Sequence, residues 1–371
     1  MSMIVTPDLT YLDGALEPGL AIHVEGDRIT AVTPATGPGH LRPHVFMPGA
    51  QDLQVNGGGG VMLNSAPTPD TLRTMAAAHR ALGTTAILPT VITDRPAVID
   101  AAADAAIEVN GEPGQLGLHI EGPHLAPSRK GTHDVNLIRP LDRTTLATVE
   151  RLRTAGLTVM VTLAPERADP ALLAELVATG AIVSAGHTAA DADEARAAFE
   201  AGVSNVTHLY NAMEPMASRA PGLLAATILS EVPFGIIADG IHVHWDMLRI
   251  ALAARPRQDR AYLVSDAMAT VGGPDHFDLY GQTIHVRDGA LVNAEGSLAG
   301  AHIDMLTSIR NVHHHAGIPL SQAIAMATDI PRAVLGLPPQ VAASGEILSD
   351  YIMLDEGLAL LPPDQINRTM P

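Results

Sequence analysis

A (β/α)₈ barrel with a small β-sandwich domain is the fold that this 371-residue sequence predicts. Apolar runs of strand length alternate eight times with Ala-rich segments of helical periodicity, which is the pattern of a parallel barrel covered by helices. Hydrophobic residues make up 47% of the chain and aromatic residues only 3%, so small aliphatic side chains must fill the core, as they do around buried parallel strands. Short β-like segments stand outside this alternation at both ends.

The β-like segments at the two ends predict the small domain. The stretch 21–32 has two β-rich runs around a Glu-Gly-Asp-Arg turn, which is typical of a hairpin. Near the other end, 345–355 is again short and strand-like. Neither is long enough to fold separately. We therefore expect 1–44 and 343–371 to pair into a small β-sandwich domain beside a barrel of residues 45–342.

The barrel elements follow in chain order. We expect strands at 45–55, 85–91, 116–121, 157–163, 182–187, 205–208, 235–239 and 261–266. The clearest helices between them are expected at 70–82, 95–109, 143–155, 170–178 and 191–201. A hairpin at 282–292 around an Arg-Asp-Gly turn predicts an insertion near 278–296, and closing helices are expected at 308–315 and 320–327. Eight such units predict a barrel of the TIM type.

The composition excludes several kinds of site and partner. The chain has no Cys, so disulfides and thiolate metal sites are excluded, and any metal must be held by His, Asp, Glu or amide side chains. The formal net charge of −18 argues against nucleic acid and anionic membrane as partners. The first ten residues do not resemble a signal peptide, and no apolar run approaches the roughly 20 residues of a membrane span. A cytoplasmic location is the expectation.

Ionisable residues end several predicted strands, where a barrel of this type carries its catalytic groups. The third, fifth and sixth strands end at Glu121, His187 and His208. Two imidazoles and one carboxylate suit a catalytic divalent ion with an open coordination position, and such an ion lowers the pKa of its bound water to about 7. The eighth strand ends at Asp266, which we expect to be the general base; the alternative is a helix N-cap.

Eight stretches then show a family resemblance. The most specific are HIEGPHLAPSRKGTHD at 119–134 and THLYNAM at 207–213. The others are PGAQDLQVNGGGG at 48–60, SAGHTAA at 184–190, SRAPGL at 218–223, IADGIH at 237–242, LVSDAMATVG at 263–272 and SLAGA at 297–301. In this order, and over nearly the whole chain, they resemble N-acetylglucosamine-6-phosphate deacetylases of the amidohydrolase superfamily.

The resemblance implies an activity and its requirements. It implies hydrolysis of the acetamide of N-acetyl-D-glucosamine 6-phosphate to D-glucosamine 6-phosphate and acetate, in amino-sugar metabolism. It implies a homodimer and one divalent metal ion per subunit, with Zn favoured and Fe, Co or Mn as alternatives. The matching metal ligands are Glu121, His187 and His208, and Asp266 matches the catalytic aspartate. His133 matches a histidine that helps to polarise the acetyl carbonyl.

The substrate contacts are also implied by the resemblance. Asn211 and the backbone of Ala212 match residues at the phosphate or sugar end. Arg219 and His242 match phosphate-binding cations, and a partner subunit is a candidate source of one of them. Guanidinium recognises phosphate with two parallel hydrogen bonds, and imidazole adds a further donor, so this pair answers the unfavourable net charge.

The first strand raises the question of a second metal. Many members of the superfamily carry His-x-His there, whereas this chain has Gln54 and Asn56. Residues two apart share one face of a strand, so both are expected in the barrel mouth. Amides are poorer ligands than imidazoles for zinc-like ions. We therefore expect this second-metal position to be empty or weak and the site to be mononuclear.

The sequence departs from the family at His124, Ala126, Ala220 and Ala301. We expect these departures to affect the sugar-facing contacts, and hence the choice between epimers. The glycines at 57–60 are followed by no Gly-Lys-Ser/Thr, so a tight turn is favoured over a nucleotide-binding loop.

Two other functions stay open from the sequence. The same residues would serve a deacetylase of N-acetylgalactosamine 6-phosphate or of another N-acyl compound. A remote alternative is a non-catalytic amidohydrolase relative that acts as an assembly protein. Such relatives usually lose metal ligands, whereas this chain keeps the set together with Asp266.

Overall fold

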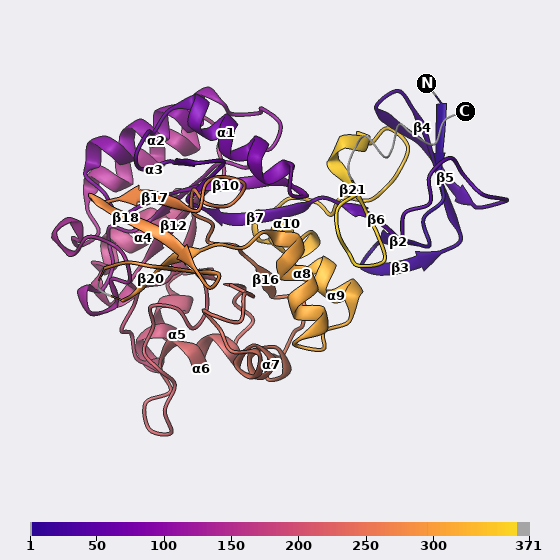
Figure 1. The fold of residues 1–371 in the computed structure, drawn as a ribbon. Helices are drawn as coiled ribbons and strands as arrows, with labels where there is room; N and C mark the ends of the chain where they lie inside the picture. The colour runs from indigo at the N-terminus through magenta and orange to yellow at the C-terminus, as the bar shows by residue number, and fades with distance from the viewer. Residues whose placement is uncertain (1, 295, 362–371) are drawn as a thin grey trace.

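The small domain consists of two β-sheets in a computed structural model that describes residues 2–294 and 296–361. One sheet has the order β1-β4-β5, formed by Ser2–Val5, Leu20–Glu25 and Arg28–Pro34. The other has the order β21-β6-β2-β3, formed by Tyr351–Leu354, Val45–Pro48, Leu9–Leu12 and Ala15–Pro18. The first and the last described strands, β1 and β21, therefore both belong to this domain (Figure 1). The predicted second piece, 343–371, is described only as far as residue 361.

An eight-stranded parallel sheet forms the larger domain, with helices packed around it (Figure 1). Its order, β7-β10-β11-β12-β13-β14-β15-β16, is the chain order, and a parallel bridge between Val55 and Ala267 closes the barrel. The strands are Ala50–Val55, Thr84–Ile92, Leu118–Glu121, Val159–Leu163, Ile182–Ala185, Asn205–Val206, Phe234–Ile236 and Ala261–Leu263. The predicted (β/α)₈ barrel is confirmed.

The predicted first strand, 45–55, is wrong as a single strand. Residues 45–48 form β6 of the small domain, and β7 begins at Ala50. The break lies at Gly49, where a Cβ atom would stand 2.1 Å from the Thr85 Cγ2 atom. The chain can therefore pass from one sheet to the other only with glycine at this close approach.

Ten helices are present in the described part of the chain. They are α1 (Pro69–Arg80), α2 (Pro96–Glu108), α3 (Arg143–Thr154), α4 (Pro170–Ala178), α5 (Ala192–Glu200), α6 (Gly222–Ile228), α7 (Trp245–Ala253), α8 (Met305–His314), α9 (Leu320–Ala325) and α10 (Asp329–Val334). Side chains of Asp142, Asp169 and Asp191 cap α3, α4 and α5 by accepting backbone N–H groups. Single 3₁₀ turns occur at Pro127–Arg129, Val135–Leu137, Pro165–Arg167 and Leu348–Asp350.

The insertion after the eighth strand is larger than the predicted hairpin. It is a four-stranded antiparallel sheet of β17 (His276–Leu279), β18 (Gln282–Arg287), β19 (Ala290–Val292) and β20 (Leu298–Ala301). The predicted hairpin corresponds to β18 and β19. Nearer the start of the barrel, β8 (Gly57–Gly58) and β9 (Val61–Met62) form a small hairpin. Gly59 and Gly60 turn it with φ of 63° and 86°, so the predicted tight turn is confirmed.

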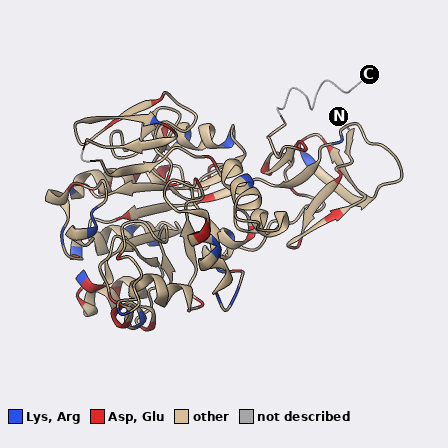
Figure 2. Ribbon diagram, turned by 60° about the horizontal axis from the view of Figure 1, so that its bottom comes forward, with Lys and Arg blue, Asp and Glu red and all other residues tan. Residues whose placement is uncertain are grey.

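Acidic and basic residues occur along the chain in both domains (Figure 2). Among the described residues, no helix combines the length and the apolar character that crossing a membrane requires.

Candidate active site

The reactive residues at the strand ends surround one cavity of about 300 Å³. Glu121 is the last residue of β11, and His187 and His208 each follow the last residue of their strand, in β13 and β14, by two positions. The predicted strands 182–187 and 205–208 end early because His187 and His208 have φ of 49° and 28°, outside the strand region. The cavity is bordered by Glu121, His133, His187, His208, Asn211, Ala212, His242 and Asp266, with other residues of the same loops.

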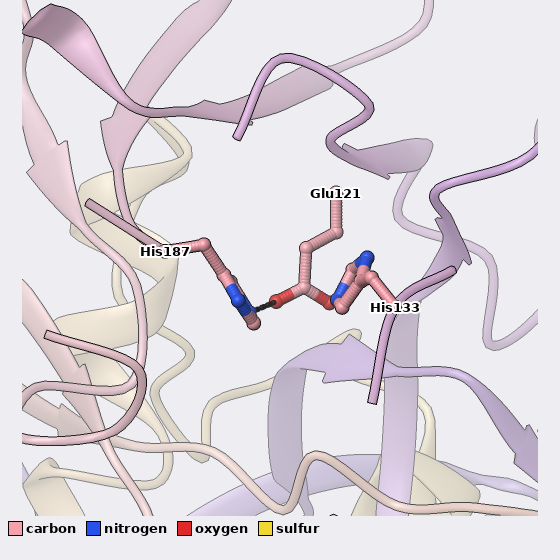
Figure 3. Close-up of side chains that lie close together, drawn as sticks. All are labelled: Glu121, His133 and His187. Carbon is pink, nitrogen blue, oxygen red and sulfur yellow. Dashed lines mark hydrogen bonds and ion pairs between the residues drawn. The ribbon is translucent and has the colours of Figure 1, made fainter. Parts of the chain in front are cut away.

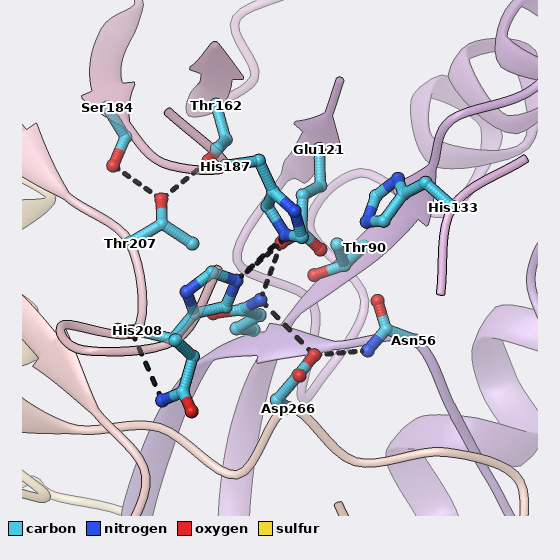
Figure 4. A network of polar contacts seen from close by, with 12 residues as sticks. Asn56, Thr90, Glu121, His133, Thr162, Ser184, His187, Thr207, His208 and Asp266 are labelled. Carbon is cyan, nitrogen blue, oxygen red and sulfur yellow. Dashed lines mark hydrogen bonds and ion pairs between the residues drawn. The ribbon is translucent and has the colours of Figure 1, made fainter. Parts of the chain in front are cut away.

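Three donor atoms of this cavity converge on one point (Figure 4). The Oε1 atom of Glu121 lies 3.2 Å from Nε2 of His187 and 3.0 Å from Nε2 of His208. The two Nε2 atoms are 3.1 Å apart. Donor atoms in a tetrahedral zinc site, with bonds of about 2.0–2.1 Å, are roughly 3.3 Å apart. The triangle therefore has the dimensions of one face of a metal coordination shell.

The tautomer of His187 fits this assignment. Its Nδ1 atom lies 2.9 Å from the backbone oxygen of Arg129, an acceptor only, so Nδ1 carries the hydrogen. In the neutral ring Nε2 then keeps its lone pair and can bind a metal. In His208, Nδ1 has no partner among the described residues. Glu121, His187 and His208 are all buried. Glu121, His187 and His208 are therefore better explained as ligands of a dication than as side chains that hydrogen-bond only to one another.

Asp266 lies beside the triangle, on the loop after β16, with a φ of 53°. Its Oδ1 atom accepts hydrogen bonds from Nε2 of Gln54 at 3.2 Å and from Nδ2 of Asn56 at 2.7 Å. Burial, together with the nearby Glu121 carboxylate, raises the pKa of Asp266 to about 6. A carboxyl group with a pKa near neutrality is suited to moving a proton in either direction.

The amides of Gln54, in β7, and of Asn56, just after it, face the carboxylates with their nitrogen atoms. Gln54 also donates from Nε2 to Oε1 of Glu121 at 3.1 Å. In Asn56, Oδ1 has no partner among the described residues. Gln54 and Asn56 are thus in the barrel mouth, as their spacing predicts. They orient Asp266 and Glu121 by hydrogen bonds.

His133 lies near both Glu121 and His187 (Figure 3). Its ring packs edge-on against His187, with centroids 4.4 Å apart, and its Nδ1 atom lies 2.7 Å from the hydroxyl oxygen of Thr93. Burial lowers the pKa of His133 to about 3, so the ring is neutral. Together with Glu121 and His187 it forms a potential metal-binding group with donors within 4.8 Å. His208 is the better third ligand, because its Nε2 touches both other donors.

Sequence reasoning missed two residues that hold these histidines. Thr93, at the end of the second barrel strand, contacts His133, and its backbone oxygen accepts a hydrogen bond from the Tyr280 hydroxyl at 2.5 Å. Glu166 accepts from the hydroxyl of Thr188 and the N–H of Ala189, the two residues after His187. No local sequence pattern marks either residue, because each acts on a loop distant in the chain.

Beside the triangle, buried polar side chains of neighbouring barrel strands form a continuous series of contacts, of which Figure 4 shows Thr162, Ser184 and Thr207. His119, two residues before Glu121, places Nε2 2.7 Å from the Thr162 hydroxyl oxygen. That oxygen lies 2.6 Å from the hydroxyl of Thr207, which lies 2.6 Å from that of Ser184. These contacts hold together the barrel strands whose following residues border the cavity.

His242 borders the cavity from the loop after β15, and Asp239 holds it in place. The Oδ2 atom of Asp239 lies 2.5 Å from Nδ1 of His242, and Oδ1 accepts the N–H groups of Ile241 and His242. The side chains of Asp239 and His242 are both buried. Despite burial, which opposes ionisation, His242 keeps the pKa of Asp239 below its usual value. An imidazole paired with a carboxylate presents Nε2 as a donor to an anionic ligand.

Arg219 lies outside this cavity. It is exposed, in a loop before α6, and borders a separate hollow of about 550 Å³ with Arg196 and Glu214. The structure therefore brings together ten of the eleven predicted site residues around the barrel mouth, Gln54 and Asn56 included, and leaves Arg219 apart.

The four departures from the family pattern are not in the cavity wall. His124 is buried against Arg139 and Thr145, and Ala126 donates its N–H to the backbone oxygen of His187. Ala220 is on the exposed Arg219 loop, and Ala301 donates its N–H to the backbone oxygen of Asp266. The expected effect of these residues on the sugar-facing contacts stays a prediction, and His124, Ala126 and Ala301 could act on the cavity only through the loops that they contact.

Comparison with known proteins decides the family. The model of the amidohydrolase family matches residues 45–343, most of the chain. The chain belongs to the amidohydrolase family. Members of this family are metal-dependent hydrolases, which agrees with the Glu–His cluster in the barrel mouth of this amidohydrolase.

Curated relatives are similar over most of the amidohydrolase. An N-acetylgalactosamine-6-phosphate deacetylase from Shewanella sp. (strain ANA-3) is 40% identical over 326 residues, covering 86% of this chain and 82% of the relative. An N-acetylglucosamine-6-phosphate deacetylase from Haemophilus influenzae is 35% identical over 336 residues, covering 87% of each chain.

Solved structures agree with the fold over nearly the full length. N-acetylglucosamine-6-phosphate deacetylase from Pasteurella multocida has a TM-score of 0.89 and 32% identity, with 97% of each chain covered. A mutant of the Mycobacterium smegmatis deacetylase in complex with N-acetyl-D-glucosamine-6-phosphate has a TM-score of 0.87 and 32% identity, covering 97% of this chain and 96% of that one.

Proposed function

We propose that this amidohydrolase removes the acetyl group from N-acetyl-D-glucosamine 6-phosphate, giving D-glucosamine 6-phosphate and acetate. The observation that carries the proposal is the convergence of Glu121, His187 and His208 beside Asp266 in one cavity. Metal donors and a proton-transfer group at one barrel mouth are what amide hydrolysis requires. The choice of substrate is supported by the N-acetylhexosamine-phosphate deacetylases that are similar over most of the chain.

One divalent ion per subunit is part of the proposal, with Glu121, His187 and His208 as its ligands. Zinc is favoured over iron, cobalt and manganese, because two imidazoles and one carboxylate are typical of catalytic zinc. When bound, the ion supplies Lewis acidity toward the acetamide oxygen and acidifies water. A single ion is favoured because Gln54 and Asn56 direct amide nitrogens, which are not ligands, at the carboxylates.

The protein residues divide the chemistry among them. Asp266 accepts the proton of the attacking water and returns it to the departing nitrogen, so that one proton is moved and none is lost. His133, a neutral ring, donates from Nε2 to the acetamide oxygen when Thr93 donates to its Nδ1. His242, Asn211 and the backbone of Ala212 line the part of the cavity proposed for the sugar and phosphate.

We further propose a homodimer in which Arg219 of the partner subunit completes the phosphate site. Within one chain Arg219 is exposed and outside the catalytic cavity, so it can serve a phosphate only across an interface. A cytoplasmic location stays a prediction.

The Asp266→Asn variant tests the role of the base. We expect it to keep the fold and the bound metal, because asparagine can still hydrogen-bond, and to lose about 10²–10⁴-fold in turnover, the usual contribution of general acid–base catalysis. Acetate release by metal-loaded protein measures it. Asp193→Asn, at an exposed position of α5, is the matched control and should keep wild-type turnover. Retention of more than about a tenth of the wild-type rate would show that Asp266 is not the base.

N-acetylgalactosamine 6-phosphate is the second candidate substrate, since the Shewanella relative that bears this activity in its name is 40% identical. We expect acetate release from both 6-phosphates, with a higher kcat/KM for the glucosamine epimer, and a large loss when the phosphate is absent. A panel of both N-acetylhexosamines, with and without phosphate, measures this. A preference for the galactosamine epimer would overturn the first choice, and no release from either phosphate would overturn the proposed function.

A further inference from the structure

A second group of potential metal donors lies on the inserted sheet, away from the catalytic cavity. Asp275, His276 and His285 place one donor atom each within 4.8 Å of one another. The two imidazole rings face each other across β17 and β18, with centroids 5.4 Å apart and planes tilted by 31°. None of the three borders the catalytic cavity. We propose that they bind one borderline transition-metal dication, of which Zn²⁺ is the test case.

The backbone of the hairpin fixes this pair at a favourable separation. β17 and β18 are antiparallel, and His276 is directly opposite His285. The preceding pair is hydrogen-bonded, because Val286 donates its N–H to the oxygen of Asp275 at 2.8 Å. Since the two kinds of pair alternate, His276 and His285 form a non-hydrogen-bonded pair, in which side chains approach most closely. The ligand separation is therefore set by the sheet.

Because the site is exposed, binding an ion there requires little change in the contacts that stabilise the fold. His276 and Asp275 are 52% and 84% exposed, so their side chains can turn toward an ion without leaving a buried partner unpaired. Binding would replace the contact between Nδ1 of His276 and Oδ1 of Asp275, at 3.0 Å. An ion bound by both groups substitutes for it.

The charges and donor types select the ion. Asp278 is two residues beyond His276 on the same face of β17, and Arg287 is two residues beyond His285 on the same face of β18, while Asp275 contacts His276 directly. The fixed charge around the imidazoles is thus net negative and favours a dication. Imidazole with carboxylate suits Zn²⁺, Cu²⁺ and Ni²⁺, whereas Ca²⁺ and Mg²⁺ prefer oxygen donors alone.

Occupation of this site has two consequences. The turn between the two strands carries Tyr280, whose hydroxyl donates to Thr93, the neighbour of His133, so an ion that joins the strands also stabilises an edge of the active site. The protein would also bind one more equivalent of Zn²⁺ than its catalytic site holds. That equivalent would resemble a second catalytic metal in a simple metal analysis.

Zinc titration of the holoenzyme tests the proposal, at pH 7.5, where an ordinary histidine is neutral. Calorimetry with enzyme already holding its catalytic ion should show one further equivalent, and thermal melting should rise with free Zn²⁺. His285→Asn should weaken this equivalent at least about 10-fold, since even an outer-shell partner of a metal is worth 10–100-fold. His314→Asn, at another exposed imidazole adjoining a second histidine, should change nothing.

Other results would overturn the proposal. These are absence of the further equivalent in the wild type, its full retention in His285→Asn, or its loss in Asn56→Ala, which would place the second ion beside Asp266 instead. Acetate release without added Zn²⁺ should be unchanged in His285→Asn, and this checks that the variant is folded. His276→Asn gives an independent reading of the same ligand pair should the first variant misfold.

Discussion

At the scale of single residues, the active site is held in backbone conformations that ordinary side chains avoid. His187, His208, Ala212 and Asp266 all have positive φ, in the left-handed region. Such residues cost of order 1–3 kcal/mol each and persist only where surrounding contacts impose them. The contacts are present: Glu166 holds the loop after His187, and Ala301 holds the backbone of Asp266. These strained backbone conformations direct the four residues toward the same cavity at the barrel mouth.

The sequence predicted some residues of the site and not others. Glu121, His187, His208 and Asp266 could be found because each ends an apolar run, and strand ends of a barrel meet. Thr93 and Glu166 could not, since they act through contacts between distant loops. The orientation of the Gln54 and Asn56 amides also needed the structure, because it depends on the carboxylates opposite them.

Asn56 tunes the proposed base, and its removal should change the pH dependence. Its Nδ2 donates to Oδ1 of Asp266 at 2.7 Å, a hydrogen bond that favours the ionised carboxylate and lowers its pKa. Asn56→Ala should raise that pKa. Because the base must be ionised, activity would then be lost at a higher pH as the solution is acidified. The acid limb of kcat/KM against pH measures the shift.

Gln54 remains as a donor in this variant, so Asp266 should stay in place and turnover should fall far less than in Asp266→Asn. Asn110→Ala, which removes an exposed amide bonded to a backbone oxygen, is the matched control. An acid limb that stays in place, or moves to lower pH, would contradict the role of Asn56.

At the scale of elements, the sequence patterns predicted which helices and strands exist better than they predicted where each begins and ends. Helices that begin at an aspartate cap, such as α3 and α5, were predicted within about two residues of the observed ends. Strands β14, β15 and β16 are only two or three residues long, because the reactive residues that follow them leave the sheet. The division at Gly49 was not visible in the sequence, since the apolar run continues across it and only the pairing of β6 and β7 in different sheets, with the close approach to Thr85, identifies it.

At the scale of the whole molecule, a chain of formal charge −18 is proposed to bind a sugar phosphate. The negative net charge opposes this, and Figure 2 shows acidic and basic residues interspersed along the ribbon of both domains. Recognition must therefore be local, through short-range donors inside the cavity and, in the proposed dimer, one guanidinium from across the interface. His242 was predictable as a donor from the motif resemblance. The distance of Arg219 from the cavity of its own chain was not, because it depends on how the loop packs.

Buried histidines should make the stability of the whole protein depend on pH. Burial lowers the pKa of His79 and of His124 below the 6.5 of an unfolded histidine. As the pH falls below about 6.5, the unfolded chain therefore binds protons that the folded chain does not. Stability is complete above this pH and is lost on acidification toward the folded-state pKa, by up to about 1.4 kcal/mol per pH unit for each histidine.

His124→Phe isolates one of these contributions. Phenylalanine cannot titrate, so the fall in the urea midpoint between pH 7.5 and 5.5 should be smaller than in the wild type. At pH 7.5 the variant should be less stable by about 1–3 kcal/mol, because the Thr145 hydroxyl and the Arg139 oxygen lose their partner. His314→Asn, an exposed imidazole, should reproduce the wild-type dependence. Metal release on acidification affects all three proteins alike, so an equal fall in all three would show that His124 does not contribute.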